Sequence, residues 1–299
     1  MGLFEERLNS YVDMINEAAD EYLSASAFKG RESSGLEKML EAMTYSLKNG
    51  GKRIRPALTL EFCRVCGGEA KSALPFALAA EMIHTYSLIH DDLPCMDNDD
   101  MRRGKPSNHK VFGYANALLA GDGLLTIAFE TLLSAPLSAE KKAGAGLELA
   151  KASGCSGMIA GQVMDLANEG KKVSLDDIAA TDRLKTGEMI RVSAVLGCIA
   201  AGADDERIKA AETYCEKIGL AFQIVDDILD VTSSEAELGK PIGSDSSNEK
   251  STYVSFLGLD KSREAVRTLT DEAKKSLEIF GKDGEFLLEL AESLAERKN

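Results

Sequence analysis

The stretch FQIVDDILD (222–230) places three carboxylates in a segment whose other residues are apolar apart from one Gln. It lies inside a longer segment, 205–231, whose apolar residues keep the spacing of one helix face. At about 100° per residue, Asp226 and Asp230 share a face of that helix, and Gln223 lies one turn earlier. Neighbouring carboxylates repel one another and are expensive to bury. We therefore expect this face to line a cavity and to bind hard cations, which prefer oxygen ligands.

Helical spacing of apolar residues extends over almost the whole chain, without convincing strand alternation or a sequence repeat. Two stretches break the pattern: a polar loop at about 92–108, and 232–251, whose Ser, Gly and Glu content is typical of a mobile loop. Since no linker-like change in composition divides the chain, we expect one all-α domain spanning residues 1–299. The other helical segments run over about 4–22, 36–48, 55–66, 70–90, 114–134, 138–169 and 175–202, and from about 252 onward.

The composition limits the classes of partner. The chain has 35 Lys and Arg against 49 Asp and Glu, a formal net charge of −14, and 44% apolar residues. The apolar share excludes wholesale disorder, and the acidic excess argues against nucleic acid or an anionic membrane surface as the main partner. The longest uncharged stretch, Ala152–Met164, has 13 residues, whereas a membrane-spanning helix needs about 20, so we expect no integral membrane segment.

Six cysteines are spread along the chain, and a chain of 299 residues does not need a disulfide framework. Since the N-terminus lacks a secretory signal, we expect reduced thiols and a cytoplasmic location. Cys63-x-x-Cys66, followed by His84 and His90, resembles a zinc pattern only superficially, because the gap to His84 is longer than in zinc fingers. We expect buried thiols instead.

A second acidic cluster, HDDLPCMDNDD (90–100), follows a long apolar helical segment. By itself it indicates no more than a solvated helix end, and its spacing does not fit an EF-hand. Basic residues change this interpretation, because Arg102 and Arg103 follow at once, GKRIRP (51–56) precedes, and Lys185 comes later. Carboxylates that hold Mg²⁺, together with Lys and Arg that neutralise the remaining charge, are what a diphosphate site requires.

In this order the motifs resemble those of trans-isoprenyl diphosphate synthases of the bacterial farnesyl diphosphate synthase type, over nearly the whole chain. The resemblance implies an isoprenoid synthase fold of ten or more helices around a central cavity. It also implies Mg²⁺-dependent condensation of isopentenyl diphosphate with dimethylallyl or geranyl diphosphate, three Mg²⁺ ions with substrate bound, and a homodimer. The motifs that carry it are GGKRIRP (50–56), HTYSLIHDDLPCMDNDDMRRGKPSNH (84–109), LAGDGLL (119–125), GQVMDL (161–166), KTGEMIR (185–191), FQIVDDILD (222–230), LGK (238–240) and KSTY (250–253).

The resemblance also implies a role for individual residues. Those that hold Mg²⁺, directly or in support, are Asp91, Asp92, Asp97, Asp226, Asp227 and Asp230. Those at the allylic diphosphate are Arg102, Lys185 and Lys240, with Lys250 at the other end of the late loop. Those at the isopentenyl diphosphate are Lys52, Arg55, His84 and Arg103. Thr186 and Gln223 face the reacting carbons, where their oxygen dipoles would stabilise a carbocation.

Product length depends on the residues before the first acidic cluster. Tyr86 and Ser87 come five and four residues before Asp91, and Tyr86 therefore lies about 7–8 Å deeper along the helix. A phenol ring there would act as a floor, because an overpacked site does not accept further methylenes. In the family that this chain resembles, an aromatic residue at this position goes with a C15 product and a smaller one with C20, so Tyr86 predicts farnesyl diphosphate.

Four alternatives remain. A simple metal-binding helical protein would not require the Lys and Arg set. A geranylgeranyl diphosphate synthase would differ only in cavity depth. A terpene cyclase would carry Asn, Ser and Glu in its second metal motif and would not need GKRIRP (51–56). A non-catalytic subunit of a heteromeric synthase tends to lose Asp ligands, and both motifs are intact here.

Overall fold

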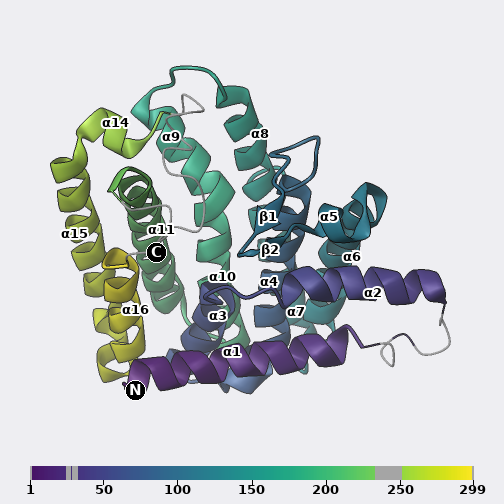
Figure 1. Cartoon of the computed structure of the whole chain (residues 1–299). Helices are drawn as coiled ribbons and strands as arrows, with labels where there is room; N and C mark the ends of the chain where they lie inside the picture. Colours follow the sequence, from purple (N-terminus) through teal and green to yellow (C-terminus); the bar gives the residue numbers. More distant parts are fainter. Residues whose placement is uncertain (1, 25–27, 29–32, 233–250, 298–299) are drawn as a thin grey trace.

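The computed structural model describes residues 2–24, 28, 33–232 and 251–297. Nearly all regular structure within them is helical (Figure 1). A short antiparallel ladder is the exception, formed by β1 (Met101–Arg102) and β2 (Lys105–Pro106). The helices up to the middle of the chain are α1 (Leu3–Tyr22), α2 (Ser34–Leu47), α3 (Ile54–Val65), η2 (Ala70–Ala73), α4 (Leu74–Asp91), α5 (Asn108–Phe112), α6 (Tyr114–Leu133), α7 (Ala139–Ser153) and α8 (Met158–Asn168). Those that follow are α9 (Leu175–Asp182), η3 (Arg183–Gly187), α10 (Glu188–Ala201), α11 (Asp205–Thr232), α14 (Tyr253–Leu257), α15 (Leu259–Ser276), η4 (Leu277–Gly284) and α16 (Glu285–Ala295).

Local signals account for where several helices begin. Ser33 and Ser138 each accept a hydrogen bond from a backbone N–H of the first turn, in α2 and α7 respectively. Ser174 and Thr252 form reciprocal capping boxes at the start of α9 and α14. Each cap satisfies backbone donors that a helix start otherwise leaves unpaired, and removing one costs about 1 kcal/mol.

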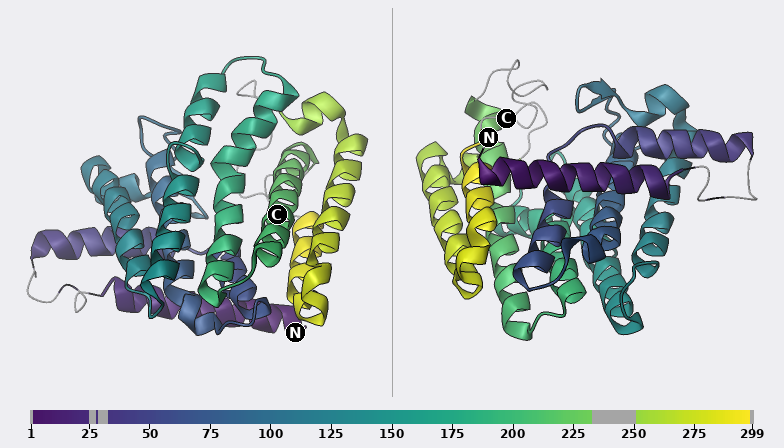
Figure 2. Two further views of the ribbon diagram at one scale, coloured as in Figure 1. Left: turned by 180° about the vertical axis from the view of Figure 1, so that it is seen from behind. Right: turned by 90° about the horizontal axis from the view of Figure 1, so that it is seen from below.

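The core is built around α4, which is buried on nearly every face. It packs against α6 on one side and α3 on the other, and α10 packs on α3, α7 and α11. α15 and α16 lie along α11 as an outer layer, while α1 lies across one end of the bundle (Figures 1 and 2). The expected all-α fold is confirmed.

Glycine permits one close approach at the centre of this core. A Cβ at Gly197 on α10 would lie 2.2 Å from the carbonyl oxygen of Thr59 on α3, so a larger residue would push the two helices apart. The hydroxyl of Thr59 donates a hydrogen bond to the carbonyl of Ser193 at 2.8 Å across the same contact.

Three expected segments differ in detail. The segment expected to be helical over 138–169 is broken into α7 and α8, because Gly154 and Gly157 adopt conformations that are not helical. The segment 175–202 contains the π-helical turn η3, which apolar spacing does not reveal. The loop at 92–108 contains the β1–β2 ladder, which is too short for a strand pattern to register.

Within the described residues, one helix is long and apolar enough to cross a membrane, namely α6. Core helices of globular proteins pass the same test, and the inner face of α6, with Ala117, Leu124 and Ala128, packs against α4. The absence of a membrane segment stays a prediction.

Candidate active site

The first acidic cluster lies where α4 ends. Asp91 is the last residue of α4, and the next turn folds back so that the backbone N–H of Asp97 donates to the carbonyl of Asp91 at 2.9 Å. Burial, together with the nearby carboxylate of Asp97, raises the pKa of Asp91 to about 6. Asp92 is buried and accepts a hydrogen bond from the Nε of Arg102 at 2.8 Å. A resident arginine therefore neutralises Asp92, whereas Asp91 faces further carboxylates and would gain from a bound cation.

The second acidic cluster lies on α11. Arg297 is ion-paired with Asp226. The Oδ2 of Asp227 accepts a hydrogen bond from the backbone N–H of Tyr253 at 2.7 Å and so supports the start of α14. Asp226 and Asp227 line the adjoining cavity, while Asp230 is 3% exposed. The three carboxylates therefore differ in environment, and Asp226 and Asp227 are the pair that borders open space.

The π-helical turn η3 lies between the two clusters. It carries Lys185 and Thr186, and a π turn is wider than an α turn by one residue. A Cβ at Gly161 on α8 would lie 2.2 Å from the backbone nitrogen of Lys185, so glycine lets α8 pack directly on the turn. The Nζ of Lys185 lies 2.7 Å from Asp165 Oδ2, which orients the lysine.

The two acidic clusters border one cleft. The cavity beside Asp91 and the cavity beside Asp226 and Asp227 share Lys185 and Thr186 in their walls. The positive charge of Lys185 acts on Asp91 as well as on Asp165. The walls of these two cavities include three of the six carboxylates expected to hold cations, namely Asp91, Asp226 and Asp227. They also include both residues expected to face the reacting carbons, Thr186 and Gln223.

The cavity below Asp91 has a volume of about 600 Å³ and is lined mainly by apolar side chains from α4, α6 and α8. Tyr86 and Ser87 line it, as expected from their position on α4. The ring of Tyr86 is 5% exposed and packs edge to face on His90, with ring centroids 5.7 Å apart. The cavity has the size and polarity to hold a prenyl chain.

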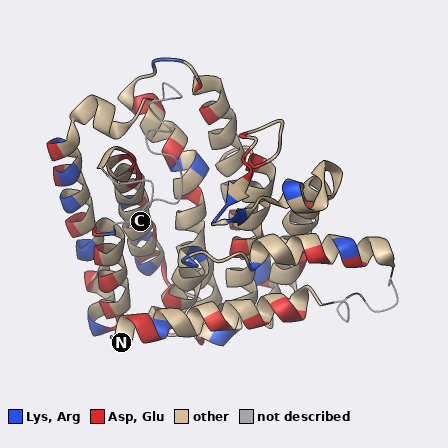
Figure 3. Cartoon of the chain, in the orientation of Figure 1, with Lys and Arg blue, Asp and Glu red and all other residues tan. Residues whose placement is uncertain are grey.

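A basic cluster borders the same cavity, since Arg55 and His84 are among its lining residues. An Nη of Arg103 lies 3.4 Å from the Nε2 of His84 and the other donates to the carbonyl of Gly50 at 2.8 Å. Burial and the charges of Arg55 and Arg103 hold the pKa of His84 well below its usual range, so the imidazole is neutral. The Nε of Arg55 is buried without a hydrogen-bond partner in the structure. Two guanidinium groups beside a neutral imidazole are a donor set suited to an anion. Arg103 comes from the turn of the basic β1–β2 hairpin (Figure 3).

Lys52 follows Gly50 and Gly51, which lie against Arg103, and its charge interacts with Asp226 and Arg297. Burial lowers the pKa of Lys52, and the charge of Arg297 lowers it further while Asp226 raises it. Arg53 has a different task, because it is buried in an ion pair with Glu81 at 2.6 Å and adopts a left-handed backbone with φ of 50°. Among the basic residues of GKRIRP, Arg53 therefore belongs to the core, whereas Lys52 and Arg55 are candidates for the binding site.

Sequence reasoning missed three residues of the cleft. Asp165 pairs with Lys185, Asp182 accepts a hydrogen bond from Gln223, and Arg297 pairs with Asp226. Asp165 could have been found, since it lies in the quoted motif GQVMDL, but nothing in the local sequence distinguishes Asp182 or Arg297 from surface charges. The predicted substrate-binding residues Lys240 and Lys250, and most of the predicted loop 232–251, lie outside the described residues.

The donor set fits a divalent cation shared with a ligand. In the described part of the chain, no three His, Cys, Asp or Glu side chains converge closely enough to hold a metal by themselves. This also disfavours the zinc pattern, and Cys66 instead lies 3.8 Å from Cys198, sulfur to sulfur. Asp91 and Asp226 offer hard oxygen ligands on the two sides of the cleft, so an ion there would need further oxygens from a bound anion such as diphosphate.

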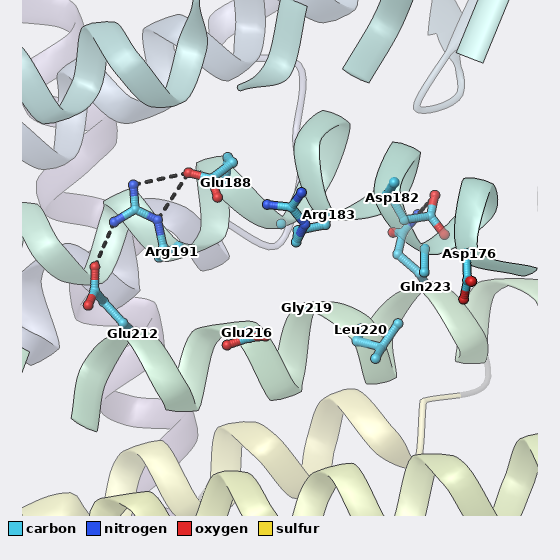
Figure 4. A pocket seen from close by; sticks show the side chains of 13 residues that line it. Asp176, Asp182, Arg183, Glu188, Arg191, Glu212, Glu216, Gly219, Leu220 and Gln223 are labelled. Atoms are coloured by element: carbon cyan, nitrogen blue, oxygen red, sulfur yellow. Dashed lines mark hydrogen bonds and ion pairs between the residues drawn. The ribbon is translucent and has the colours of Figure 1, made fainter. Parts of the chain in front are cut away.

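A separate cavity of about 590 Å³ lies behind the cleft, between α11 and the segment from α9 to α10 (Figure 4). At one end Arg191 is held by Glu188 at 3.0 Å and Glu212 at 2.8 Å. At the other end lie Asp182 and Gln223, which also line the cavity beside Asp226.

Comparison with known proteins points in the same direction. Residues 36–282 match the family model described as "Polyprenyl synthetase". The chain is 43% identical to the farnesyl diphosphate synthase of Geobacillus stearothermophilus, over 98% of this chain and 97% of that protein. It is 50% identical to the large subunit 1 of the chloroplastic heterodimeric geranylgeranyl pyrophosphate synthase of Arabidopsis thaliana, over 88% and 73%. A solved structure of an FPP/GFPP synthase from Zymomonas mobilis superposes with a TM-score of 0.87 at 34% identity and covers 98% of both chains.

Proposed function

The chain belongs to the polyprenyl synthetase family and is a trans-prenyltransferase that condenses isopentenyl diphosphate with allylic diphosphates, and on that premise we propose that its product is (2E,6E)-farnesyl diphosphate. Dimethylallyl and geranyl diphosphate would be its allylic substrates. The observation that carries the proposal is the buried ring of Tyr86 in the wall of the 600 Å³ cavity, five residues before Asp91. A ring at that depth limits how many methylenes the cavity accepts.

We assign the metal to the two sides of the cleft. Asp91, Asp97 and Asp226 would hold Mg²⁺, the ion that this family generally uses, with Asp92, Asp227 and Asp230 in support. When bound, Mg²⁺ would neutralise the negative charge of the diphosphate leaving group. Lys185 is held by Asp165 and its charge acts on Asp91, which supports a role for its ammonium group in neutralising that leaving group.

The remaining residues bind, orient and exclude water. Positive charge and hydrogen-bond donors are concentrated near the cleft by the residues that would bind isopentenyl diphosphate, namely Lys52, Arg55, His84 and Arg103. Arg102 reaches Asp92 and Asp99 and would contact the allylic diphosphate from the β1–β2 hairpin. Thr186 and Gln223 would direct oxygen dipoles toward the allylic cation, and the apolar walls below Asp91 would keep water from it. Lys240 and Lys250 would contact substrate from the late loop.

The first test is product analysis with isopentenyl diphosphate, each allylic diphosphate and Mg²⁺. A C15 product that is lost in Asp91→Ala supports the proposal. A C20 product would support the second candidate, a geranylgeranyl diphosphate synthase, which is favoured by the relatives of that name at 50% and 49% identity. No product with any allylic substrate would favour a non-catalytic subunit.

The oligomeric state and location are also proposals. Leu119 on α6 is an exposed apolar residue, with 55% of its surface accessible. Leu118 and Val163, at the rim of the cavity below Asp91, are 39% and 61% accessible. Exposed apolar patches mark interfaces, so we propose a homodimer that buries this surface. Leu119→Lys should convert the dimer to a monomer in light scattering. A cytoplasmic location agrees with six cysteines that form no disulfide.

A further inference from the structure

Asp182 lies between two cavities and has no role in the proposed reaction so far. It is the last residue of α9, and the π turn that carries Lys185 begins at the next residue. Asp182 and Gln223 are the two residues that line both the cavity beside Asp226 and the cavity behind it (Figure 4). Together they form the partition between the two spaces.

The hydrogen bond between these residues determines which end of the Gln223 amide faces Asp182. The Nε2 of Gln223 donates a hydrogen bond to Asp182 Oδ1 at 3.4 Å. An ionised carboxylate only accepts hydrogen bonds, so it turns the amide nitrogen of Gln223 toward itself. The carbonyl oxygen of the same planar amide must then face away from Asp182.

A carboxylate at this place is costly. Burial raises the pKa of Asp182 to about 6, and the charges of Asp165 and Asp226 add to the effect, while Gln223 and Lys185 oppose it. A buried carboxylate with like charges around it destabilises the fold, and such groups cluster at functional sites. Asp182 makes no hydrogen bond that caps a helix, and its side-chain partner in the structure is Gln223.

We propose that Asp182 is a positioning residue, which holds the amide of Gln223 so that its carbonyl oxygen faces the allylic carbon in the cleft. The inference rests on the proposed function, in which Gln223 lies beside a developing carbocation. A carbonyl dipole fixed in that direction stabilises positive charge without having to reorient during the reaction. Without Asp182 the amide could rotate and present its nitrogen, the positive end of the dipole, to the cation.

The test is a double-mutant cycle. Asp182→Ala should lower kcat by about tenfold, less than the loss of a direct electrostatic contact, and leave the KM of both diphosphates within twofold. Asp182→Asn keeps a carbonyl acceptor but adds a competing donor, so its loss should be smaller, about threefold. In a Gln223→Ala background, either substitution should cost less than a further twofold, because the group it positions is gone. Asp176 is an exposed carboxylate on the same helix and lines the cavity behind the cleft, so Asp176→Ala is the control and should leave kcat unchanged.

A binding measurement separates positioning from a structural role. An ammonium analogue of the allylic cation, bound with inorganic diphosphate and Mg²⁺, should lose about tenfold in affinity in Asp182→Ala, as a transition-state mimic does when a dipole is lost. Inorganic diphosphate with Mg²⁺ alone should bind as in the unsubstituted enzyme. If Asp182→Ala does not fold by circular dichroism, Asp182→Asn carries both measurements.

Other outcomes would overturn the inference. An undiminished loss in the Gln223→Ala background, a rise in KM at constant kcat, or equal affinity for the ammonium analogue would each do so. A fully active Asp182→Ala enzyme would refute the positioning role of Asp182 but would not contradict the proposed function. If the unsubstituted enzyme forms no prenyl product, the proposed function fails first and the inference falls with it.

Discussion

Arg297, near the end of the chain, is ion-paired with Asp226, which lies 71 residues earlier on α11. Its guanidinium group also lies 3.9 Å from the ring centroid of Phe222 and donates to the carbonyl of that residue at 3.3 Å. The arginine side chain is 10% exposed, so a protein cation occupies the carboxylate that we assign to Mg²⁺. Loading of the metal must therefore displace or share this contact.

Removing that cation should strengthen binding of the metal alone. We expect Arg297→Ala to bind Mg²⁺ about two- to fivefold more tightly in calorimetry without substrate, the range of a partly exposed ion pair. Loss of the contact with the Phe222 ring should lower the free energy of unfolding by about 1 kcal/mol. Arg267→Ala, an exposed arginine on α15, is the control and should change neither value. Unchanged or weaker Mg²⁺ binding in Arg297→Ala would contradict the competition.

Tyr86 should set the length of the product. Tyr86→Ala opens the floor of the cavity and should move the main product from C15 to C20 or longer, as shown by chromatography of the dephosphorylated alcohols. Tyr86→Phe is the matched control, because it keeps the ring and should keep the C15 product. The Tyr86 hydroxyl is buried without a hydrogen-bond partner in the structure, so Phe should also stabilise the fold by up to about 1 kcal/mol. A C15 product from Tyr86→Ala would show that the ring of Tyr86 does not limit the product length.

Asp91 should make the metal-free protein less stable as the pH rises. Its pKa is about 6 in the folded chain, against about 3.9 for an unfolded aspartate, so the folded state holds the proton more tightly. This contribution to stability is fully present below pH 4 and is lost as the pH rises through 6. Asp91→Asn cannot ionise, and we expect it to gain about 1–2 kcal/mol over the unsubstituted protein at pH 7.5 and nothing at pH 4.

Urea unfolding at both pH values measures this difference. The exposed Asp13→Asn on α1 serves as the control, with no gain that depends on pH. The same Asp91→Asn variant should lose prenyltransferase activity. Equal stability of Asp91→Asn and the unsubstituted protein at pH 7.5 would mean that burial does not raise the pKa of Asp91.

The ion pair between Arg53 and Glu81 should stabilise the fold and take no part in substrate binding. Both side chains are 3% exposed, and their closest atoms are 2.6 Å apart. Glu81→Gln leaves an arginine buried without its counter-charge and should lower the free energy of unfolding by about 3 kcal/mol in urea. The exposed Glu41→Gln on α2 should cost less than about 0.5 kcal/mol. Full stability of Glu81→Gln would show that water or another group solvates Arg53.

The sequence by itself determined the all-α class, most helix boundaries and the identity of the two acidic motifs. These depend on local signals, namely the 3.6-residue period of apolar side chains and the glycine and proline residues at helix ends. A further local signal is the presence of carboxylates within or directly after apolar helical segments, where burying them is costly. The depth of Tyr86 relative to Asp91 also followed from helical rise, because both residues lie on one uninterrupted helix.

Only the tertiary structure decided how the charges are shared. The pairing of Arg102 with Asp92 follows from a hairpin that folds back, and the pairing of Arg297 with Asp226 from the packing of α16 beside α11. The π turn that directs Lys185 and Thr186 into the cleft, and the bond between Asp182 and Gln223, depend on where α8 and α11 pack against it. Such contacts join residues far apart in the chain, and their energy depends on distance and burial, which a one-dimensional pattern of residue types does not contain.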